Sequence, residues 1–373
     1  MELRVIQTLD DFVSLRHRWP VPDTTVAGSG IFLSYDWFYC CLCSFRKDKI
    51  LNIIVAEDGA EIIGLAPFWI FQSKTRGVPV RTMSFIVVPD TPWVDFVIRQ
   101  GKQKETIEIF MKHVAATQRH LWDSLELSRF SMKSTNYAIL RDVIATMGLK
   151  SYQGFKNQIP YLEIREDWDT FINQKSKNFR KRQRNIANSI EKMGDITTEI
   201  IAQGSVEKVL HDIMLVSGHS WKNKAGVAIP NSRESIHFFE CLTSMAMARG
   251  WLDVWILKKR GHPVAFEYHL MSDNRIHSLR SDFDETYRDI SPGYLLLSAI
   301  IKNVFQKGCS EFHLGPGAHE YKFDWTNRVH EQDSITISNN TCAGIAVWFI
   351  EARIKPAAKL IRDRLLRLQG KRA

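Results

Sequence analysis

Two stretches of the chain carry the same pattern of apolar and polar positions, one in each half. Residues 51–56 and 61–68 are apolar runs separated by a polar turn, and residues 251–257 and 264–271 repeat that arrangement. Apolar runs of this length on both sides of a short turn predict β-hairpins. The repetition predicts a tandem duplication, in which each half combines a mixed, mostly antiparallel sheet with flanking helices.

The second hairpin opens the segment that carries most of the predicted chemistry, residues 251–322. A third strand is expected at 276–281, and the apolar residues 295–301 have the length of a helix. Before that helix stand Ser291-Pro292-Gly293, residue types that are typical of an N-cap and a first helical position. A helix N-terminus directs free N–H groups at the space beyond the sheet, so we expect an anion site there.

The chain as a whole is predicted to be an α/β (α+β) protein. At 373 residues the chain is longer than a typical single domain and long enough to form two. We expect an N-terminal half over residues 1–150, a C-terminal half over 151–340 and a basic amphipathic helix over 341–373. The first half has no Pro-Gly turn before a long helix. We therefore assign it no cofactor and expect it to shape the acceptor cleft.

The positive charge of the chain, +9 in total, is concentrated in two segments. Residues 175–184 contain six Lys or Arg and no acid, and residues 353–373 contain eight with one Asp. Local basic charge favours an anionic ligand or surface at two places over a protein that coats nucleic acid. The C-terminal segment either lies on an anionic membrane or packs on the domain and leaves its bases in solvent.

The remaining composition predicts a cytoplasmic protein. The chain does not open with the charged and apolar regions of a signal peptide, and the apolar run at 343–350 is too short to span a bilayer. Six cysteines are spaced neither as a zinc site nor as a disulfide framework. If the C-terminal helix binds lipid, we expect the protein to be peripheral to the inner membrane.

The first basic segment forms one stripe on a predicted helix. Lys177, Arg180, Lys181 and Arg184 occupy positions i, i+3, i+4 and i+7, which are neighbours on a helix surface. One interpretation is a solvated helix face. The other is contact with a phosphate or sugar-acid group of an acceptor, because Arg offers a bidentate fork to such oxygens.

The order of strands, turn, helix and short strand resembles the core of the GNAT acyltransferase superfamily. A finer resemblance is to the branch of the FemAB-type transferases and the CelD-like acetyltransferases of cellulose and exopolysaccharide synthesis. It covers roughly residues 159–330. The matching residues are Phe179-Arg180-Lys181-Arg182 after Ser176-Lys177, Pro263-Val264-Ala265-Phe266, the interval from Asp284 to Ser291-Pro292-Gly293, and Gly315-Pro316-Gly317 followed by Tyr321-Lys322.

The resemblance implies a donor site and an acceptor site. In GNAT relatives the turn before the helix holds the pyrophosphate of an acyl-coenzyme A, so we expect acyl-CoA, acetyl-CoA foremost, as co-substrate. The residues assigned to it are Arg288, Ser291, Pro292, Gly293 and Tyr294. In FemAB-type relatives the basic helix meets a phosphorylated cell-wall precursor, which assigns Lys177 and Arg180 to the acceptor.

Glu267 is the candidate general base. It shares one face of its predicted strand with Ala265 and His269, and a buried unpaired carboxylate in an apolar strand would be unfavourable by several kcal/mol. A structural salt bridge or an exposed position is the alternative. His269 is the second candidate. Tyr321 matches the family's Tyr-Lys and is expected to protonate the leaving thiolate, with plain packing as the alternative.

Three further residues are predicted to bind substrate: Asp282, His313 and Lys322. Asp282 follows the third strand, where capping of the loop is the alternative, and Lys322 completes the Tyr-Lys pair. Relatives often carry an acid before and after the Gly-x-Gly loop, where this chain has His313 and His319-Glu320. Two histidines in the cleft would offer another base. Without a third ligand they are a poor metal signal, so we predict no metal.

These features together predict an acyltransferase that moves an acyl group from coenzyme A to an amine or hydroxyl of a small-molecule or lipid-linked sugar acceptor. One rival is a FemAB-like enzyme that takes an aminoacyl group from charged tRNA, in which the basic stripe would touch RNA. The other is a non-catalytic scaffold of a polysaccharide synthase at the membrane. Nucleic acid other than tRNA is not expected as a partner.

Overall fold

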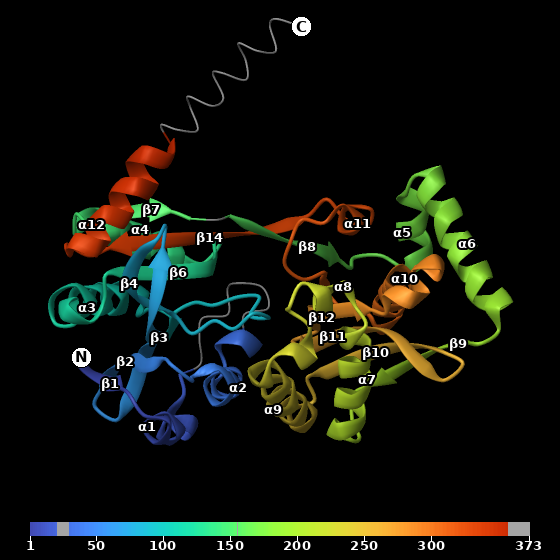
Figure 1. Cartoon of the computed structure of the whole chain (residues 1–373), viewed down its shortest axis with the longest axis horizontal. Coiled ribbons are helices and arrows are strands. Elements are labelled where there is room, and N and C mark those ends of the chain that lie inside the picture. The colour runs from blue at the N-terminus through green and yellow to red at the C-terminus, as the bar shows by residue number, and fades with distance from the viewer. Residues whose placement is uncertain (21–29, 155, 357–373) are drawn as a thin grey trace, which may run out of the picture.

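The computed structural model describes residues 1–20, 30–154 and 156–356. Within them, fourteen strands form one mixed sheet with helices on both faces, which confirms the predicted α/β fold class (Figure 1). The strand order is β1-β2-β3-β4-β6-β14-β8-β13-β12-β11-β10-β9, with β5 beside β3 and β7 beside β14.

The first half contains seven of the strands in the described residues, together with four α-helices. Its strands are β1 (Glu2–Ile6), β2 (Ile50–Asp58), β3 (Glu61–Thr75), β4 (Val78–Phe85), β5 (Val97–Ile98), β6 (Ser124–Ser131) and β7 (Ser151–Gln153). Its helices are α1 (Leu9–Ser14), α2 (Tyr35–Phe45), α3 (Gln103–Ala116) and α4 (Thr135–Thr146), with short 3-10 turns η1 (Arg16–Arg18), η2 (Ile31–Leu33) and η3 (Arg119–Leu121).

The second half begins with β8. Its strands are β8 (Asn157–Glu163), β9 (Ile196–Ile201), β10 (Leu252–Lys259), β11 (His262–Ser272), β12 (Arg275–Phe283), β13 (Glu311–His313) and β14 (Val329–Ser338). Its helical elements are α5 (Trp168–Gln174), α6 (Lys177–Met193), α7 (Val206–Gly218), α8 (Trp221–Lys224), η4 (Ile229–Asn231), α9 (Arg233–Arg249), η5 (Glu285–Ile290), α10 (Pro292–Lys307), α11 (Glu320–Phe323), α12 (Cys342–Phe349) and the π-helical turn η6 (Ile350–Ile354).

The two halves repeat one strand arrangement. In the first half β2, β3 and β4 are antiparallel, and β6 then pairs with β4 in parallel. In the second half β10, β11 and β12 are antiparallel, and β13 pairs with β12 in parallel. A helix precedes each parallel strand, α3 in the first half and α10 in the second. This repetition agrees with the tandem organisation predicted from the two hairpins.

Strand β14 joins the halves into one sheet. It pairs with β6 of the first half and with β8 of the second, antiparallel to both, and crosses between the halves in Figure 1. The last strand of the chain therefore lies in the middle of the sheet. The domain limits expected at residues 150 and 340 stay a prediction, because β14 belongs to both pairings.

Helices cover the second half of the sheet on its two faces. α10 packs on β10, β11 and β12 from one side, where Leu296, Ile300 and Ile301 are buried, and α7 and α9 pack from the other. α9 also packs on α2 of the first half, so one apolar core extends across both halves. Buried apolar area of this extent is the main stabilising contribution to the fold.

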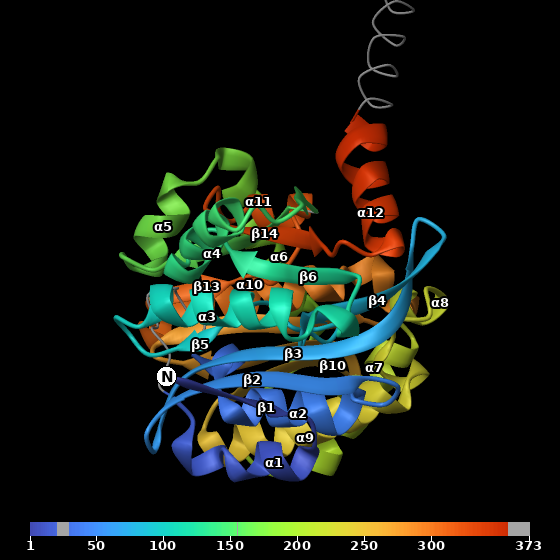
Figure 2. The same cartoon turned by 90° about the vertical axis from the view of Figure 1, so that its left-hand side faces the viewer.

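α12 packs on β4 and β14, and α12 and η6 together rise away from the sheet in Figure 2. Glu351 of η6 accepts from Arg76 at 2.6 Å, tying this segment to the first half. Residues 357–373, which carry most of the predicted basic cluster, lie outside the described part of the chain. None of the helices in that described part is long and apolar enough to cross a membrane.

Candidate active site

The parallel strands β12 and β13 separate at the candidate site. They pair only over residues 275–277 and 311–313. Beyond this point Leu314 donates to the carbonyl of Pro160 on β8 at 2.9 Å, while β12 stays with β11. Gly315 follows with φ 78°, and a Cβ there would lie 3.0 Å from the Ser278 carbonyl oxygen. Glycine therefore permits the loop to cross β12 where the strands part.

Glu267 lies on β11 next to this separation. Its side chain is buried, and its Oε2 accepts a hydrogen bond from Ser278 Oγ at 2.9 Å and lies 3.3 Å from His269 Nε2. The carboxylate is thus paired, as the sequence required of a buried acid in an apolar strand. Ser278 was not expected in the site. It reaches Glu267 because a bulge shifts the register of β11 and β12 at Tyr268/His269.

His269 connects Glu267 to a second buried carboxylate. Its Nδ1 lies 3.3 Å from Asp253 Oδ2, and Lys307 at the end of α10 donates to Asp253 Oδ1 at 3.0 Å. Although burial lowers the pKa of His269, hydrogen bonds to Asp253 and Glu267 raise it to about 8. Burial raises the pKa of Asp253, but His269 and Lys307 more than offset this and lower it. Glu267, His269 and Asp253 form one buried chain of ionisable groups, and the exposed Lys307 pairs with its Asp253 end.

Lys322 and Tyr321 on the short helix α11 lie beside Glu267. Lys322 is buried, and its Nζ donates to the carbonyls of Gly315 and Pro316, each at 2.9 Å. Burial lowers the pKa of Lys322 to about 8, although the nearby Glu267 carboxylate favours its charged form. Tyr321 is 42% exposed as a residue, and partial desolvation of its phenol group together with the Glu267 charge raises its pKa. The Tyr-Lys pair is therefore electrostatically coupled to Glu267.

The turn before α10 has the expected helix start. Pro292 is the first helical residue, as expected, and Ser291 occupies the N-cap position. Ser291 has φ 51° and makes no side-chain capping hydrogen bond, so a hydroxyl cap is absent from the first turn. Tyr294 accepts from Gln183 of α6 at 3.2 Å, and the exposed Arg288 pairs with Glu285 at 2.9 Å. The 3-10 helix η5 separates this turn from the end of β12 along the chain, yet Gly293 lies against Phe283, the last residue of β12.

Asp282 is held in a buried ionic cluster. Lys222 lies 2.5 Å from Asp282 Oδ1, while Ser217 donates to Oδ2 at 2.7 Å and Arg280 at 3.3 Å. Arg280 also lies 3.4 Å from Asp90 of the first half. In this arrangement Asp282 fastens α8 to β12 and links the two halves. Its predicted contact with substrate stays a prediction.

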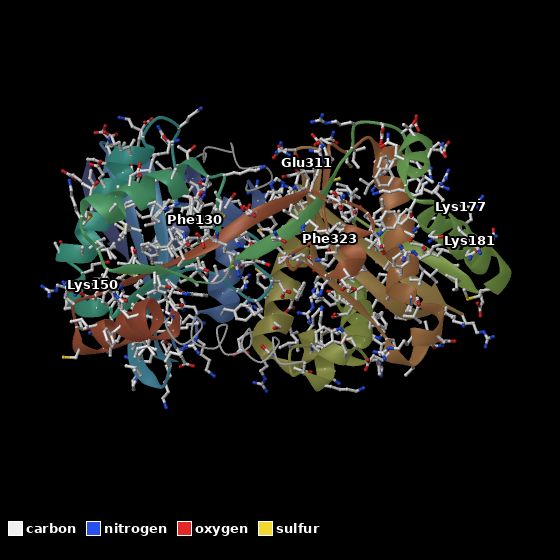
Figure 3. The ribbon with its side chains drawn as sticks, turned by 90° about the horizontal axis from the view of Figure 1, so that it is seen from above. Phe130, Lys150, Lys177, Lys181, Glu311 and Phe323 are labelled. Carbon is white, nitrogen blue, oxygen red and sulfur yellow. The ribbon has the colours of Figure 1, made fainter. Side chains whose placement is uncertain are left out.

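The basic helix α6 borders a polar cavity of about 650 Å³. Lys177 and Lys181 are exposed on its outer side at the end of the second half (Figure 3), and Arg180 is half-buried. Arg182 pairs at 2.7 Å with Asp324, the residue that follows α11. The cavity is lined by Gln174, Lys175, Ser176, Asn178, Phe179, Arg182, Phe323, Asp324 and Asn327.

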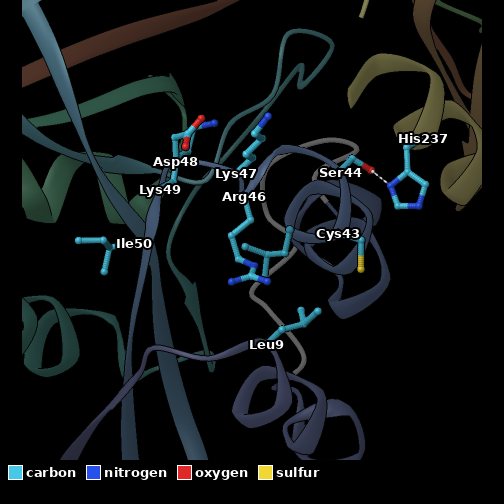
Figure 4. Close-up of a pocket in the computed structure, with 10 residues that line it drawn as sticks. Leu9, Cys43, Ser44, Arg46, Lys47, Asp48, Lys49, Ile50 and His237 are labelled. Atoms are coloured by element: carbon cyan, nitrogen blue, oxygen red, sulfur yellow. Dashed lines mark hydrogen bonds between the residues drawn. The ribbon is translucent and has the colours of Figure 1, made fainter. Parts of the chain in front are cut away.

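A second cavity of about 680 Å³ lies on the first half, between α2, the start of β2 and α9. Figure 4 shows Ser44 of α2 directed at His237 of α9, with Ser44 Oγ 3.4 Å from His237 Nδ1. Arg46, Lys47 and Lys49 also border this space. Its walls include none of the residues predicted from the sequence.

His313 lies on the opposite face of the sheet from Glu267. Phe312 contacts His269 edge-on, and side chains alternate along a strand, so His313 points the other way. It packs against His277, with ring centroids 4.5 Å apart. His319 is exposed and stacks on Tyr321. The structure therefore does not bring His313 and His319 together as an alternative base.

Comparison with known proteins supports the fold and part of the family resemblance. Residues 177–323 match a family described as "Acetyltransferase (GNAT) domain". No curated protein matches the chain. The match supports the GNAT resemblance for this segment, while the CelD-like relationship stays a prediction.

Three solved structures share the fold over most of the chain. FemX is 10% identical, with 89% of this chain and 97% of that chain covered and a TM-score of 0.53. A protein of unknown function from Bacteroides thetaiotaomicron is 12% identical, with 90% and 100% covered and a TM-score of 0.54. L-PGS from Bacillus licheniformis is 12% identical, with 82% and 88% covered and a TM-score of 0.50.

Proposed function

We propose that the protein is an acyltransferase that moves an acyl group from acyl-CoA, acetyl-CoA foremost, to an amine or hydroxyl of a sugar-related or cell-envelope acceptor. One observation carries the proposal. The buried Lys322 lies within the electrostatic influence of the buried Glu267, where β12 and β13 separate. Gly293 at the start of α10 lies against Phe283 at the end of β12, because a Cβ there would be 3.4 Å from the Phe283 ring. A base and a cation at one end of the opening, and a helix N-terminus beyond it, suit a nucleophile and an anionic donor.

In this mechanism Glu267 removes the proton of the acceptor amine or hydroxyl as the acceptor attacks the donor carbonyl. The new bond to the carbonyl carbon forms, the carbon–sulfur bond breaks, and Tyr321 gives its proton to the leaving thiolate. His269, held by Asp253, fixes the orientation of the Glu267 carboxylate. A charged Lys322 stabilises the negative charge that develops on the carbonyl oxygen.

The FemAB-like alternative, with charged tRNA as donor, is supported by the surface of α6. Lys177, Arg180 and Lys181 have no carboxylate partner among the side chains that the structure describes. Unpaired bases at neighbouring helical positions repel one another and favour an external anion. The same face also suits a phosphorylated acceptor, so the donor must be decided by binding.

The donor is tested by placing a negative charge at the start of α10. Gly293→Asp changes the second residue of α10, and Lys104→Asp changes the second residue of α3 in the first half, an exposed position. Both substitutions place a negative charge in the first turn of a helix, where it interacts favourably with the helix dipole. Gly293→Asp should weaken acetyl-CoA binding about 10-fold or more by charge repulsion, while Lys104→Asp should bind as the wild type does.

Binding is measured by thermal shift with acetyl-CoA, longer acyl-CoAs and charged tRNA. Stabilisation by an acyl-CoA that is lost in Gly293→Asp supports the proposal. Stabilisation by charged tRNA alone would replace it with the FemAB-like reaction. No change in melting temperature with any of the three donors would refute the transferase assignment and leave the non-catalytic scaffold role.

A further inference from the structure

Three histidines from three strands meet at the seam of the two halves. His277 of β12, His313 of β13 and His330 of β14 are all buried. The rings of His277 and His313 lie 4.5 Å apart, and those of His313 and His330 lie 5.1 Å apart and nearly parallel. Trp93 of the first half packs edge-on against His313 and His330. This cluster is on the face of the sheet opposite Glu267.

Four ring nitrogens of this cluster have no hydrogen-bond partner among the described residues. They are both nitrogens of His277, Nδ1 of His313 and Nε2 of His330. Leaving a buried polar atom unpaired is unfavourable by about 1–3 kcal/mol, and such atoms are rare in folded proteins. The unpaired nitrogens of His313 and His330 indicate that a ligand other than the chain binds there.

Glu311 adds a carboxylate to the cluster. It lies two residues before His313 on β13, and its Oε2 is 3.0 Å from His313 Nε2. One ligand atom each from Glu311, His313 and His330 can be chosen so that all lie within 4.8 Å of one another. The Glu311 side chain is 17% exposed, which leaves a route to solvent. Figure 3 places Glu311 between the two halves.

We propose that Glu311, His313 and His330 bind one divalent transition-metal ion, Zn²⁺ foremost. Two imidazoles and one carboxylate form a common ligand set for Zn²⁺, with water in the fourth position. Metal–ligand bonds of about 2.0–2.1 Å place ligand atoms about 3.3 Å apart, so the ligand atoms, which lie within 4.8 Å of one another, must approach by at most about 1.5 Å.

The ion would join the two halves and stay out of the transfer reaction. Its ligands come from β13 and from β14, the strand that pairs with the first half. It lies across the sheet from Glu267, so it contacts neither reacting group. The guanidinium of Arg275, 3.6 Å from Glu311, would give up part of its interaction with that carboxylate when the ion binds.

From the sequence we predicted no metal, because His313 and His319 have no third ligand near them in the chain. The structure leaves His319 exposed and separate, and brings His330 and Glu311 to His313 instead. β8 lies between β13 and β14 and brings their side chains together. The spacing of these residues along the sequence does not predict this set of ligands.

The proposal is tested on full-length protein that has been stripped with chelator and titrated with Zn²⁺ by calorimetry. We expect one ion per chain, a rise in melting temperature and a loss of affinity of about 10-fold or more in Glu311→Gln and His330→Gln. His319→Gln, at an exposed histidine, is the matched control and should bind as the wild type. Circular dichroism shows whether each variant is folded.

A second measurement uses Co²⁺, whose visible absorption reports tetrahedral nitrogen and oxygen ligands. The Co²⁺ spectrum should appear in the wild type and in His319→Gln, and should weaken in Glu311→Gln. Absence of saturable binding in the wild type, or equal binding by all folded variants, would overturn the site. Neither readout depends on acyl transfer, so failure here leaves the proposed function intact.

Discussion

The histidine between two carboxylates makes a quantitative prediction about stability. His269 is fully buried, and its imidazole is within 3.3 Å of both Asp253 and Glu267. These partners hold its pKa at about 8, against 6.5 for an ordinary histidine. His269→Gln keeps a side chain that can donate a hydrogen bond but removes the titrating group.

The sign of the effect follows from proton binding. Between pH 6.5 and about 8 the folded protein keeps the proton on His269, while the unfolded chain loses it. The native state then binds more protons, so the free energy of unfolding falls as pH rises through this window. The difference between the two pKa values corresponds to about 2 kcal/mol. Because the ring is fully buried, solvent screening does not reduce this figure.

The assay is urea denaturation at a series of pH values from 6 to 8.5. The wild type should lose up to about 2 kcal/mol from this group across the series, and His269→Gln should lack that part. Comparing the two proteins removes the contribution of Lys322, whose pKa is lowered to about 8 by burial. His262→Gln, at the exposed first residue of β11, serves as the control.

Parallel stability curves for wild type and His269→Gln would refute the reasoning. They would mean that His269 is neutral in the folded protein, and that Asp253 and Glu267 are stabilised by other groups. A flat His269→Gln curve against a falling wild-type curve would support the buried ionic chain.

Three further predictions concern the same region. Glu267→Gln removes the proposed base and should lower kcat by about 100-fold or more with little change in donor KM; unchanged steady-state turnover would exclude Glu267 from that role. Turnover of the wild type should fall as pH rises through about 8, where Lys322 loses its charge, and a Lys322→Gln variant that retains this part of the pH profile would contradict the assignment. Asp282→Asn leaves Lys222 and Arg280 facing a neutral amide and should lower the free energy of unfolding by about 3–5 kcal/mol, whereas a loss of under about 1 kcal/mol in urea would mean that water already solvates the cluster.

Local pattern was sufficient for the elements that build the candidate site. Alternation along 264–271 placed Glu267 and His269 on one face, and the Ser-Pro-Gly turn located the start of α10. Asp253 was missed, although its signal was present. It stands opposite His269 once β10 and β11 are paired, and the hairpin turn fixes that register.

Features that depend on the pairing of strands far apart in the chain could not be predicted from the sequence. His313 was assigned to the substrate cleft, yet it points to the face opposite Glu267, because its neighbour Phe312 contacts His269 and side chains alternate along β13. The sequence did not predict Glu311 and His330 as site residues. They lie far apart along the chain and become neighbours only when β13 and β14 both pair with β8. Local preferences say little about which strands pair across most of the chain.

The central place of β14 has a consequence for how the protein is made. During synthesis one edge of β6 stays unpaired until residues 329–338 leave the ribosome, which happens only after almost the entire second half has been made. An unpaired strand edge is a template for association with other chains, so the nascent protein is exposed to aggregation for most of its translation. A message truncated before this strand would yield two unfinished sheets, and we expect such products to depend on chaperones or to be degraded.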